Sequence, residues 1–497
     1  MDLFDAVSPI DYRYYGDNPT FRTRLQPYLS ENANVAYLLR VEVALVRMLA
    51  KWGICAESVA DQVEQASRGI KAGEVYEEEA RVHHNIRAVV NCIRRRIPSE
   101  SRPFVHLFAT SADIMDTAAA LRYRELVRDI LLPDLIDLEQ RLIFLASTYA
   151  DQPQIGRTHG QHAVPTTFGY SLALYVSRIG SRIAAINKAH RNLRGKFSGA
   201  VGAFNALSLY YPEDPAVLEL ELMESLGLKP VEPSVSSQIA EPEPLTDLVY
   251  SVISCFSVLA NLADDMRNLI RNEIGEVVDR YEDEEVGSST MPHKLNPKNF
   301  ENVKSLWKEF MPRMSTVFMD QISEHQRDLT NSASARFLPE LFAGFCYASL
   351  RINDALAKVQ PDRLRMLANL DSSKQHVVAE PLYIMLALHG FPDAYDTVMQ
   401  LSRESRKTGV TLLDLARKRA DLVPYFERFS ERHKAILSDP TTYIGGAPAR
   451  TAAVCDYWEP VCDTLRHVLQ SERQASNVLA TAKVIQHPNN NGDELRP

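Results

Sequence analysis

Hydrophobic side chains recur along most of this chain at intervals of three and four residues, the spacing that places them on one face of an α-helix. The longest such stripe runs from Leu245 to Ile274. Pro242 and Pro244 precede the stripe and Gly275 follows it, which is typical of the start and the end of a helix. At about 1.5 Å per residue, the stripe predicts a rod about 45 Å long.

Two further stripes indicate long helices. One follows Pro165 and continues to Ile186, and the other runs from Leu121 to Leu145 with Pro133 as an expected bend. Strand signals are nearly absent: alternating Val, Ile and Thr runs are few, and no hairpin turn of the Asn-Gly kind lies between them. The sequence therefore predicts an all-α fold, with further helices near residues 30–52, 300–320 and 335–358.

Helices of this length predict a bundle that other copies of the chain complete, because a compact monomer of this size has no room to bury both faces of each rod. The pattern divides into an N-terminal helical domain (1–112), a central long-helix bundle (113–360) and a C-terminal helical domain (361–480). Residues 481–497 are polar and aperiodic, so we expect a disordered tail.

Composition and charge narrow the class of protein. Of the 497 residues, 45% are hydrophobic and 24% charged, which is ordinary for a soluble globular protein. The net charge of −9 disfavours nucleic-acid binding, which needs a basic face. Six cysteines without a C-x-x-C pair indicate buried thiols in a reducing compartment. The proline-broken, acidic N-terminus does not look like a signal peptide, and no uninterrupted apolar run is long enough to span a membrane. We expect a cytoplasmic protein.

The segment from Gly287 to Pro297, with sequence GSSTMPHKLNP, is the most informative in the chain. It offers several backbone N–H groups and two hydroxyls, to which Lys294 adds a positive charge and Asn296 an amide donor. Such a segment suits an anion, above all one whose negative charge grows during a reaction. The alternative is a polar linker between two helices, which the combination of these residue types at fixed offsets disfavours.

Three weaker segments carry further candidates. His159 lies in Gly156–Gln161 (GRTHGQ) beside Thr158, and imidazole suits proton transfer at neutral pH, although most loop histidines are structural. His83 and His84 are adjacent in a charged helical pattern, so at most one faces a site. Arg327 and Arg336 bracket a run of hydroxyls suited to a phosphate or a carboxylate, although such pairs are usually surface ion pairs. Thr110-Ser111 and Arg13-Tyr14 are weaker signals still.

The run Gly287–Asn296 resembles the G-S-S-x-M-P-x-K-x-N loop of the fumarase/aspartase superfamily, whose members are all-helical homotetramers. Other segments, in order from residue 8 to Gly445, are similar to the adenylosuccinate lyase family: SPIDYRY (8–14), HN (84–85), TS (110–111), RTHGQ (157–161), QRDLTNS (326–332) and YIG (443–445). The chain departs from the family pattern at Asn85, where aspartate is usual, at Tyr12, where glycine is common, and at the inserted Tyr15.

The resemblance implies three helical domains, a twenty-helix core in a homotetramer, and active sites that each draw on three chains. It implies β-elimination of fumarate from adenylosuccinate, giving AMP, and from the succinyl-carboxamide ribotide SAICAR, giving AICAR, without a metal or organic cofactor. Ser288 matches the catalytic base, His159 the acid, and Glu301 the carboxylate that orients this acid.

The remaining matches are to substrate contacts. Lys294, Asn296 and the loop amides match the groups that hold the carbanion, and Arg13, Tyr14, Ser332 and Arg336 match the phosphate positions. The positions that contact the base, ribose or succinyl group, or line the site beside them, are matched by His83, His84, Asn85, Thr110, Ser111, Thr158, Gln238, Ser289 and Arg327.

Two alternatives stay open. One is another lyase of the superfamily: argininosuccinate lyase, fumarase, aspartase or carboxymuconate cycloisomerase. Arg13-Tyr14 and the 326–332 segment disfavour it, because the substrates of those enzymes carry no phosphate. The other is a catalytically silent relative, which the presence of Ser288, His159 and Lys294 disfavours.

Overall fold

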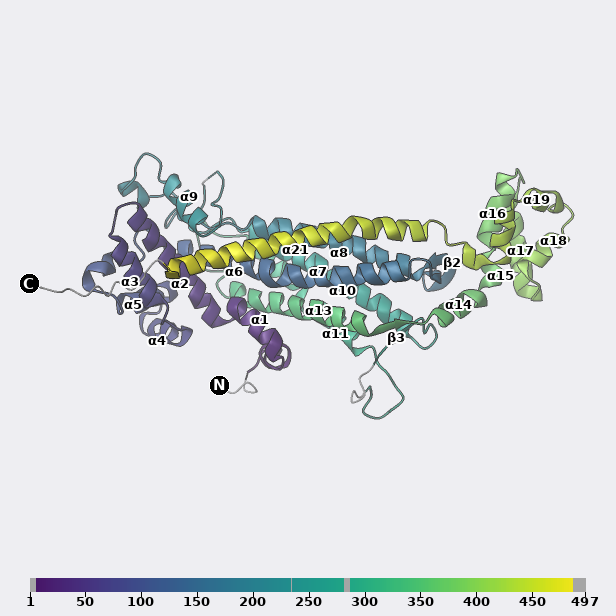
Figure 1. Ribbon diagram of the computed structural model, residues 1–497, viewed down its shortest axis with the longest axis horizontal. Helices are drawn as coiled ribbons and strands as arrows, with labels where there is room; N and C mark the ends of the chain where they lie inside the picture. The colour runs from purple at the N-terminus through teal and green to yellow at the C-terminus, as the bar shows by residue number, and fades with distance from the viewer. Residues whose placement is uncertain (1–5, 234, 281–286, 486–497) are drawn as a thin grey trace, which may run out of the picture.

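Long, nearly parallel helices form the body of the computed structural model, which describes residues 6–233, 235–280 and 287–485, with the side chains of 476–485 left out. Smaller groups of helices lie at the two ends of this body (Figure 1). The elements, in order, are α1 (Pro19–Leu29), α2 (Glu31–Lys51), α3 (Glu57–Ser67), α4 (Ala72–Val82), α5 (Asn85–Arg94), α6 (Ser111–Leu126), α7 (Leu132–Thr148), β1 (Pro153–Thr158), β2 (Gln161–Thr167), α8 (Phe168–Arg191), α9 (Ala216–Ser225), α10 (Glu243–Ile270), β3 (Val277–Asp279), α11 (Lys298–Phe310), α12 (Arg313–Met319), α13 (Leu338–Lys358), β4 (Val359–Pro361), α14 (Arg363–Ser372), α15 (Lys374–Val377), α16 (Ala379–Leu388), α17 (Ala394–Thr408), α18 (Leu412–Lys418), α19 (Val423–Arg428), α20 (Glu431–Ser438) and α21 (Ala447–Ile485).

The helices predicted from the three hydrophobic stripes are confirmed. They form α10, α8 and the pair α6–α7, which pack against one another with α11 and α13 in the central bundle. Between α6 and α7 lies a π-helical turn, Val127–Leu131, so that the backbone stays helical from Ser111 to Thr148. Pro133 follows this turn and lacks the N–H of a regular helix, which explains why the helical bonding changes here.

Helix α10 has the length and hydropathy of a helix that crosses a membrane, but 67% of its most apolar window is buried in the bundle. The same residues face α8, α11 and α13. Its apolar character is therefore that of a core helix.

The predicted C-terminal domain 361–480 needs correction. Residues from Val378 to Leu437 have a hydrophobic core of their own, whereas Cys455, Cys462 and Leu469 of α21 belong to the core of the bundle. Figure 1 shows α21 returning along the bundle, where it packs on α7 and α8. The α21 backbone continues to Ile485, into the predicted tail, and residues 486–497 lie outside the described residues.

Two small antiparallel sheets were not predicted from the sequence. Strands β1 and β2 form a hairpin, and β3 pairs with β4. The hairpin turns at His159 and Gly160, whose φ angles are 54° and 74°. Positive φ at both central residues is the requirement of a tight two-residue turn, which Asn-Gly usually meets. His159 lies in a turn, as expected for a loop residue, but the strands on either side of it were not predicted because a His-Gly pair is an uncommon way to make this turn.

Lys196 and Asp113 form a fully buried ion pair that fixes the start of α6. Both side chains have 0% exposure, and Lys196 Nζ also donates to the carbonyl oxygen of Gly199 at 3.2 Å. The other carboxyl oxygen of Asp113 accepts from the Thr110 amide at 2.8 Å and so caps the helix. The pair therefore joins the first turn of α6 to the segment that follows α8.

Glu139 is a second buried acid, on α7, and neither of its carboxyl oxygens has a hydrogen-bond partner of normal geometry among the described residues. Burial raises its pKa well above the ordinary value of 4.5, and the nearby amide of Gly180 offsets only part of this effect. The folded protein therefore holds a protonated Glu139 over a range of pH in which the unfolded chain ionises it.

Replacement of Lys196 by methionine is expected to destabilise the fold by about 3–5 kcal/mol, because it leaves Asp113 buried without its cation. Adding Asp113→Asn, which keeps the cap on Thr110, should recover most of the loss in urea unfolding. Lys51→Met is the control, since Lys51 forms an exposed pair with Glu221 and its loss should cost less than about 1 kcal/mol. A double variant no more stable than Lys196→Met would contradict this role of the pair.

Glu139→Gln is expected to raise the melting temperature at pH 7–8 by at least about 2 °C. Above pH 4.5 the unfolded chain gains stability by ionising Glu139, at about 1.4 kcal/mol per pH unit until the folded pKa is reached. The glutamine variant removes this penalty, so its advantage should shrink as the pH falls toward 4. Differential scanning fluorimetry across pH measures it, and Glu125→Gln, which removes a paired carboxylate, should lower stability instead.

Candidate functional site

The predicted residues fall into separate groups within one chain. The segment Gly287–Pro297 and His159 lie toward one end of the bundle, and the groups around His84 and the start of α6 lie at the other (Figure 1). The local geometry of each group bears on what it can do.

Ser288 accepts two hydrogen bonds from the backbone of its own segment. Its Oγ lies 3.1 Å from the amide nitrogen of Met291 and 3.4 Å from that of Thr290. The Asn296 side chain donates to the carbonyl oxygen of Gly287 at 2.8 Å and closes the segment on itself. Amides aimed at a hydroxyl oxygen stabilise negative charge on it, which is what a serine acting as a base requires.

Ser289 and Lys294 lie on the same segment with exposed side chains. The Lys294 amide donates to the carbonyl oxygen of Met291 at 3.0 Å, which closes a tight turn between these two residues. The segment thus combines a partly buried hydroxyl with exposed donors. Residues 281–286, which precede it, lie outside the described residues.

Glu301 stands in the first turn of α11 with 52% of its side chain exposed. Its Oε1 lies 3.8 Å from Nε of Arg267. Helix α11 begins at Lys298, one residue after Pro297, close to the predicted start. Within this chain the carboxylate contacts Arg267 and not the imidazole of His159 that it is expected to orient.

His159 lies exposed at the tip of the β1–β2 hairpin, next to Thr158, the last residue of β1. Two residues before it, Arg157 forms an ion pair with the buried Glu276, with 2.6 Å between Nη2 and Oε1. This pair ties the hairpin to the segment between α10 and β3. Sequence reasoning missed Glu276, which lies outside every recognised motif and is marked only by its position two residues after Ile274, the end of the α10 stripe.

A second group gathers where α4, α5 and α6 meet. The Nε2 atom of His84 lies 3.5 Å from Oγ of Ser111, and its Nδ1 accepts from the Arg87 amide at 3.2 Å, which caps α5. Asn85 Nδ2 lies 3.3 Å from the sulfur of Met115 on α6. His83 ends α4 in the left-handed conformation, with φ of 55°.

Gln238 and Arg327 approach the same helix from other parts of the chain. The Gln238 amide donates to the carbonyl oxygen of Gln326 at 3.2 Å, and the Ala240 amide donates to Asp116 on α6 at 2.9 Å. Burial raises the pKa of Asp116 to about 6, although the Ala240 amide and the charges of Lys196 and Arg327 act in the opposite direction.

Near Asp116, the two terminal nitrogens of Arg327 differ in their contacts. It donates to Asn331 through one terminal nitrogen, while the other, Nη1, is buried without a hydrogen-bond partner among the described residues. A buried guanidinium nitrogen with no acceptor is a ready contact for an anionic or carbonyl group of a ligand.

The residues predicted to hold a phosphate lie in two exposed turns. Arg13 is exposed on the π-helical turn Ile10–Gly16, and the ring of Tyr14 packs edge-on against Tyr347 at 5.1 Å. Ser332 and Arg336 are exposed in the segment before α13. Arg336 lies near Tyr76 of α4: burial and Glu31 raise the pKa of Tyr76 to about 12, and Arg336 reduces the effect.

One chain cannot bring all of these groups to a single small molecule. Ser111 begins α6, and His159 follows the end of α7 at Thr148. The backbone is helical between Ser111 and Thr148, which at about 1.5 Å per residue separates the two ends by about 55 Å. A site that contains both Ser111 and His159 therefore takes them from different chains.

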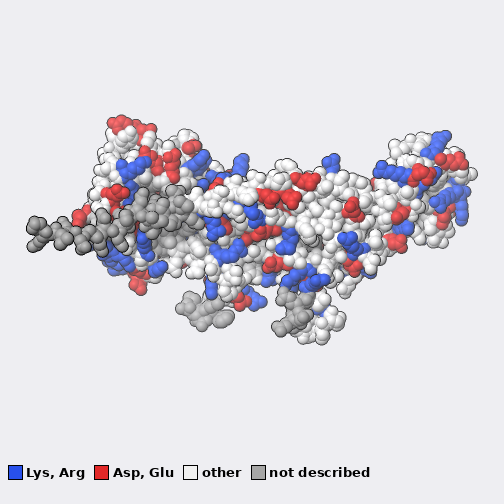
Figure 2. Space-filling view, in the orientation of Figure 1, with Lys and Arg blue, Asp and Glu red and all other residues white. Residues whose placement is uncertain are grey.

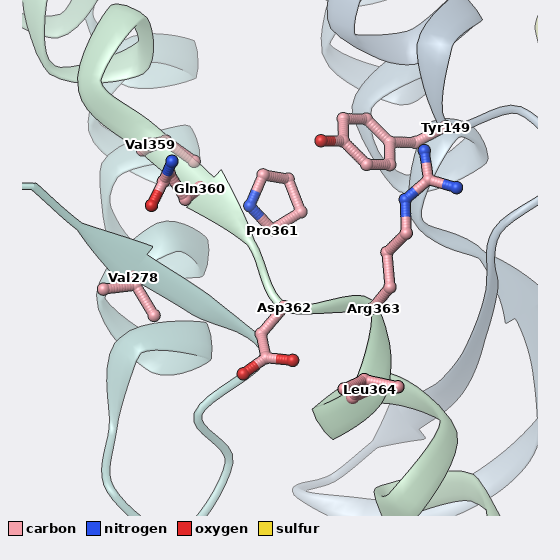
Figure 3. Close-up of a pocket in the computed structure, with 8 residues that line it drawn as sticks. All are labelled: Tyr149, Val278, Val359, Gln360, Pro361, Asp362, Arg363 and Leu364. Carbon is pink, nitrogen blue, oxygen red and sulfur yellow. The ribbon is translucent and has the colours of Figure 1, made fainter.

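Two cavities of the single chain lie apart from the predicted site. One, of about 520 Å³, is lined by Tyr149, Val278 and residues 359–364, and Figure 3 shows the Arg363 side chain beside the Tyr149 ring. The second, of about 410 Å³, lies between α1, α7 and α21. Neither lining includes a residue of the predicted site.

Family models and curated proteins match most of this chain. The family model described as Lyase matches residues 13–309, and the one described as Adenylosuccinate lyase C-terminal matches residues 323–438. The adenylosuccinate lyase of Pyrococcus abyssi is 35% identical over 468 residues, which cover 91% of this chain and 98% of that protein. That of Archaeoglobus fulgidus is 31% identical over 452 residues, covering 90% and 98%.

Solved structures share the fold at lower identity. The fumarate lyase from Mesorhizobium sp. BNC1 superposes with a TM-score of 0.76 at 24% identity, covering 87% of this chain and 97% of that one. The 3-carboxy-cis,cis-muconate lactonizing enzyme from Pseudomonas putida gives 0.76 at 25%, covering 89% and 97%. With the two family matches and relatives of at least 31% identity along nine tenths of its length, the chain belongs to the adenylosuccinate lyase family of the fumarase/aspartase superfamily.

Proposed function

We propose that this protein is an adenylosuccinate lyase that eliminates fumarate from adenylosuccinate, giving AMP, and from SAICAR, giving AICAR. The observation that carries the proposal is 35% identity to an adenylosuccinate lyase along 91% of the chain. The Ser288 geometry supports it, because removal of a proton next to a carboxylate needs a strong, stabilised base.

In the proposed mechanism Ser288 takes the proton from the succinyl carbon next to the carboxylate. A free hydroxyl is far too weak a base near pH 7, so the alkoxide has to be stabilised. The amides of Thr290 and Met291 point at Ser288 Oγ, and Lys294 on the same segment adds a positive charge. The carbanion then spreads its charge into the carboxylate, which Lys294, Asn296 and the amides hold.

His159 is the proposed acid on the opposite side of the substrate. As an imidazolium it protonates the nitrogen that leaves as fumarate forms, and an acid and a base on opposite faces give anti-elimination. Glu301 orients this imidazolium from another chain, because within one chain its carboxylate contacts Arg267. Charge is redistributed within the substrate and these side chains, so the elimination needs no metal or organic cofactor.

The nucleotide is proposed to bind through the remaining groups. Arg13, Tyr14, Ser332 and Arg336 hold the phosphate. The base, ribose and succinyl group contact Nη1 of Arg327, which has no partner among the described residues. They also contact the set His83, His84, Asn85, Thr110, Ser111, Thr158, Gln238 and Ser289. In Figure 2 acidic and basic side chains are intermixed over the visible face, which suits a small anionic substrate held in a local basic site better than a nucleic acid.

The active enzyme is proposed to be a cytoplasmic homotetramer with shared sites and a twenty-helix core. Large apolar side chains are exposed on the segments that carry site residues: Met291, Leu295, Ile322 and Leu329, the last two with 75% and 76% exposure. Apolar surface next to site residues supports contact with other subunits. The length of the helix that separates Ser111 from His159 also supports sites built from several chains.

Another lyase of the superfamily is the alternative function, since the solved neighbours include a fumarate lyase and a lactonizing enzyme. Arg13, Tyr14 and the 326–332 segment favour a phosphorylated substrate. A catalytically silent relative is disfavoured by the amides aimed at Ser288.

The purified protein is expected to turn over adenylosuccinate, which the change in ultraviolet absorbance reports. Ser288→Ala should abolish turnover, and His159→Gln should lower kcat by at least about 10²–10⁴-fold, the usual contribution of general acid catalysis. Lys51→Met, on an exposed ion pair far from these segments, is the control and should keep full activity. Turnover of argininosuccinate or fumarate with none of adenylosuccinate would overturn the proposal.

Complementation tests the shared site. His159→Gln and His84→Gln variants are each expected to be nearly inactive, and unfolding and refolding them together should restore about one quarter of wild-type activity, because random assembly gives this share of sites both native residues. A mixture of His159→Gln with His159→Ala is the control and should stay inactive. Light scattering should give a mass of four 56.0 kDa chains. An active monomer, or no recovery in the first mixture, contradicts sites shared between chains.

A further inference from the structure

Glu276 is an acid with 0% exposure. Both of its carboxylate oxygens accept hydrogen bonds from residues in distant parts of the chain. Arg157 donates to both oxygens, at 2.6 and 3.2 Å. Gln154 donates to Oε2 at 2.8 Å, and Asn369 of α14 donates to Oε1 at 2.8 Å. A buried carboxylate with four donated hydrogen bonds is rigidly held, and the loss of any partner is costly.

Two of these partners belong to the hairpin that carries His159. Gln154 and Arg157 lie on β1, and Gln154 also accepts from Ser171 of α8 at 3.1 Å. An isolated two-stranded hairpin is marginally stable by itself in water. The direction of the His159 turn therefore depends on what holds β1, and the ion pair to Glu276 is the charged contact that does so.

The backbone of Glu276 is itself fixed to the end of α10 and to the start of α14. Its amide donates to the carbonyl oxygen of Leu269 at the end of α10, and its carbonyl oxygen accepts from the Asp362 amide, both at 2.9 Å. Strand β3 begins at the next residue and pairs with β4, which precedes α14. The guanidinium of Arg365 on α14 donates to the carbonyl oxygens of Glu273 and Ile274 at 2.9 Å.

We propose that Glu276, with Arg157, is a positioning residue for the elimination: it holds the His159 hairpin in a fixed relation to the end of α10 and to α14. Neither side chain needs to touch the reacting atoms for this role. The inference rests on the proposed function. Misplacing a catalytic group by about 1 Å costs about 10²-fold in rate, so a clamp at the base of the hairpin acts on kcat.

The proposal has a matched control in the same molecule. Glu125 is also a buried carboxylate, paired with Arg40 at 2.9 Å and with the hydroxyl of Tyr37 at 2.7 Å. This pair joins α2 to α6 and contacts neither β1 nor β3. Glu125→Gln therefore removes the same charge from a similar buried pair without loosening the hairpin.

The test compares Glu276→Gln with Glu125→Gln. Both should lose similar thermal stability, but only Glu276→Gln should lower kcat for adenylosuccinate by about 10²-fold, with KM within about threefold. Hydrogen exchange of peptides from 153–167 should become faster in Glu276→Gln alone. Because both residues form one clamp, adding Arg157→Gln to Glu276→Gln should lower kcat little further. If Glu276→Gln does not fold, Arg157→Lys, which keeps the charge and loses the two-pronged contact, takes its place.

Equal kcat values in the two glutamine variants, a loss confined to KM, or multiplicative losses in the double variant would overturn the inference. A failure of the proposed function is distinguishable, because the wild-type protein would then not turn over adenylosuccinate at all. The exchange comparison decides the clamp in that case: unchanged exchange in 153–167 overturns it.

Discussion

The length of one continuous helix is the constraint on which the rest of this structure depends. The backbone from Ser111 to Thr148 is helical, through a π-helical turn at 127–131, and it separates the start of α6 from the β1–β2 hairpin by about 55 Å. Helices α8, α13 and α21 pack along this rod and bury it. The chain thus holds polar groups at two ends that never meet within one copy. Association is then a requirement of the proposed chemistry, and not an addition to it.

The two ends are held by different means. At the α6 end, the buried Lys196–Asp113 pair and the Asp116 contact to Ala240 join two remote segments to one helix. At the other end, Glu276 joins β1 to the end of α10 and to α14. In both places an ionised group is buried with every strong partner present, a costly arrangement that apolar packing would match or exceed in stability. What such a group adds is direction, because hydrogen bonds fix angles that apolar contacts leave free.

The parts of the fold with strong periodicity could be predicted from the sequence. The α10 stripe between Pro244 and Gly275 indicated both the element and its approximate ends, because apolar spacings of three and four residues over many turns match the period of an α-helix and not that of a strand. The path of α21 could not be predicted: its pattern indicates a helix but not the partner on which it packs. The hairpin at His159 could not be predicted because histidine is not a residue typical of a two-residue turn with positive φ. Among the site residues, Ser288 and Lys294 belong to a dense local motif, whereas Glu276 and Asp116 are single acids whose importance is evident only when distant segments come together.

The solved relatives at 24–25% identity have names that indicate different substrates, yet they share the fold over nearly their whole length. A fold that serves several substrates places its common chemistry and its recognition on separate elements. In this chain, the amides around Ser288 and the hairpin of His159 lie at one end of the bundle, and on the proposed function they carry the proton transfers. The groups at the start of α6, with the Arg327 nitrogen that has no partner among the described residues, lie at the other end, where they are proposed to recognise the substrate. Assembly from several chains brings the two ends together, so on the proposed function groups from several copies of the same chain meet in each site.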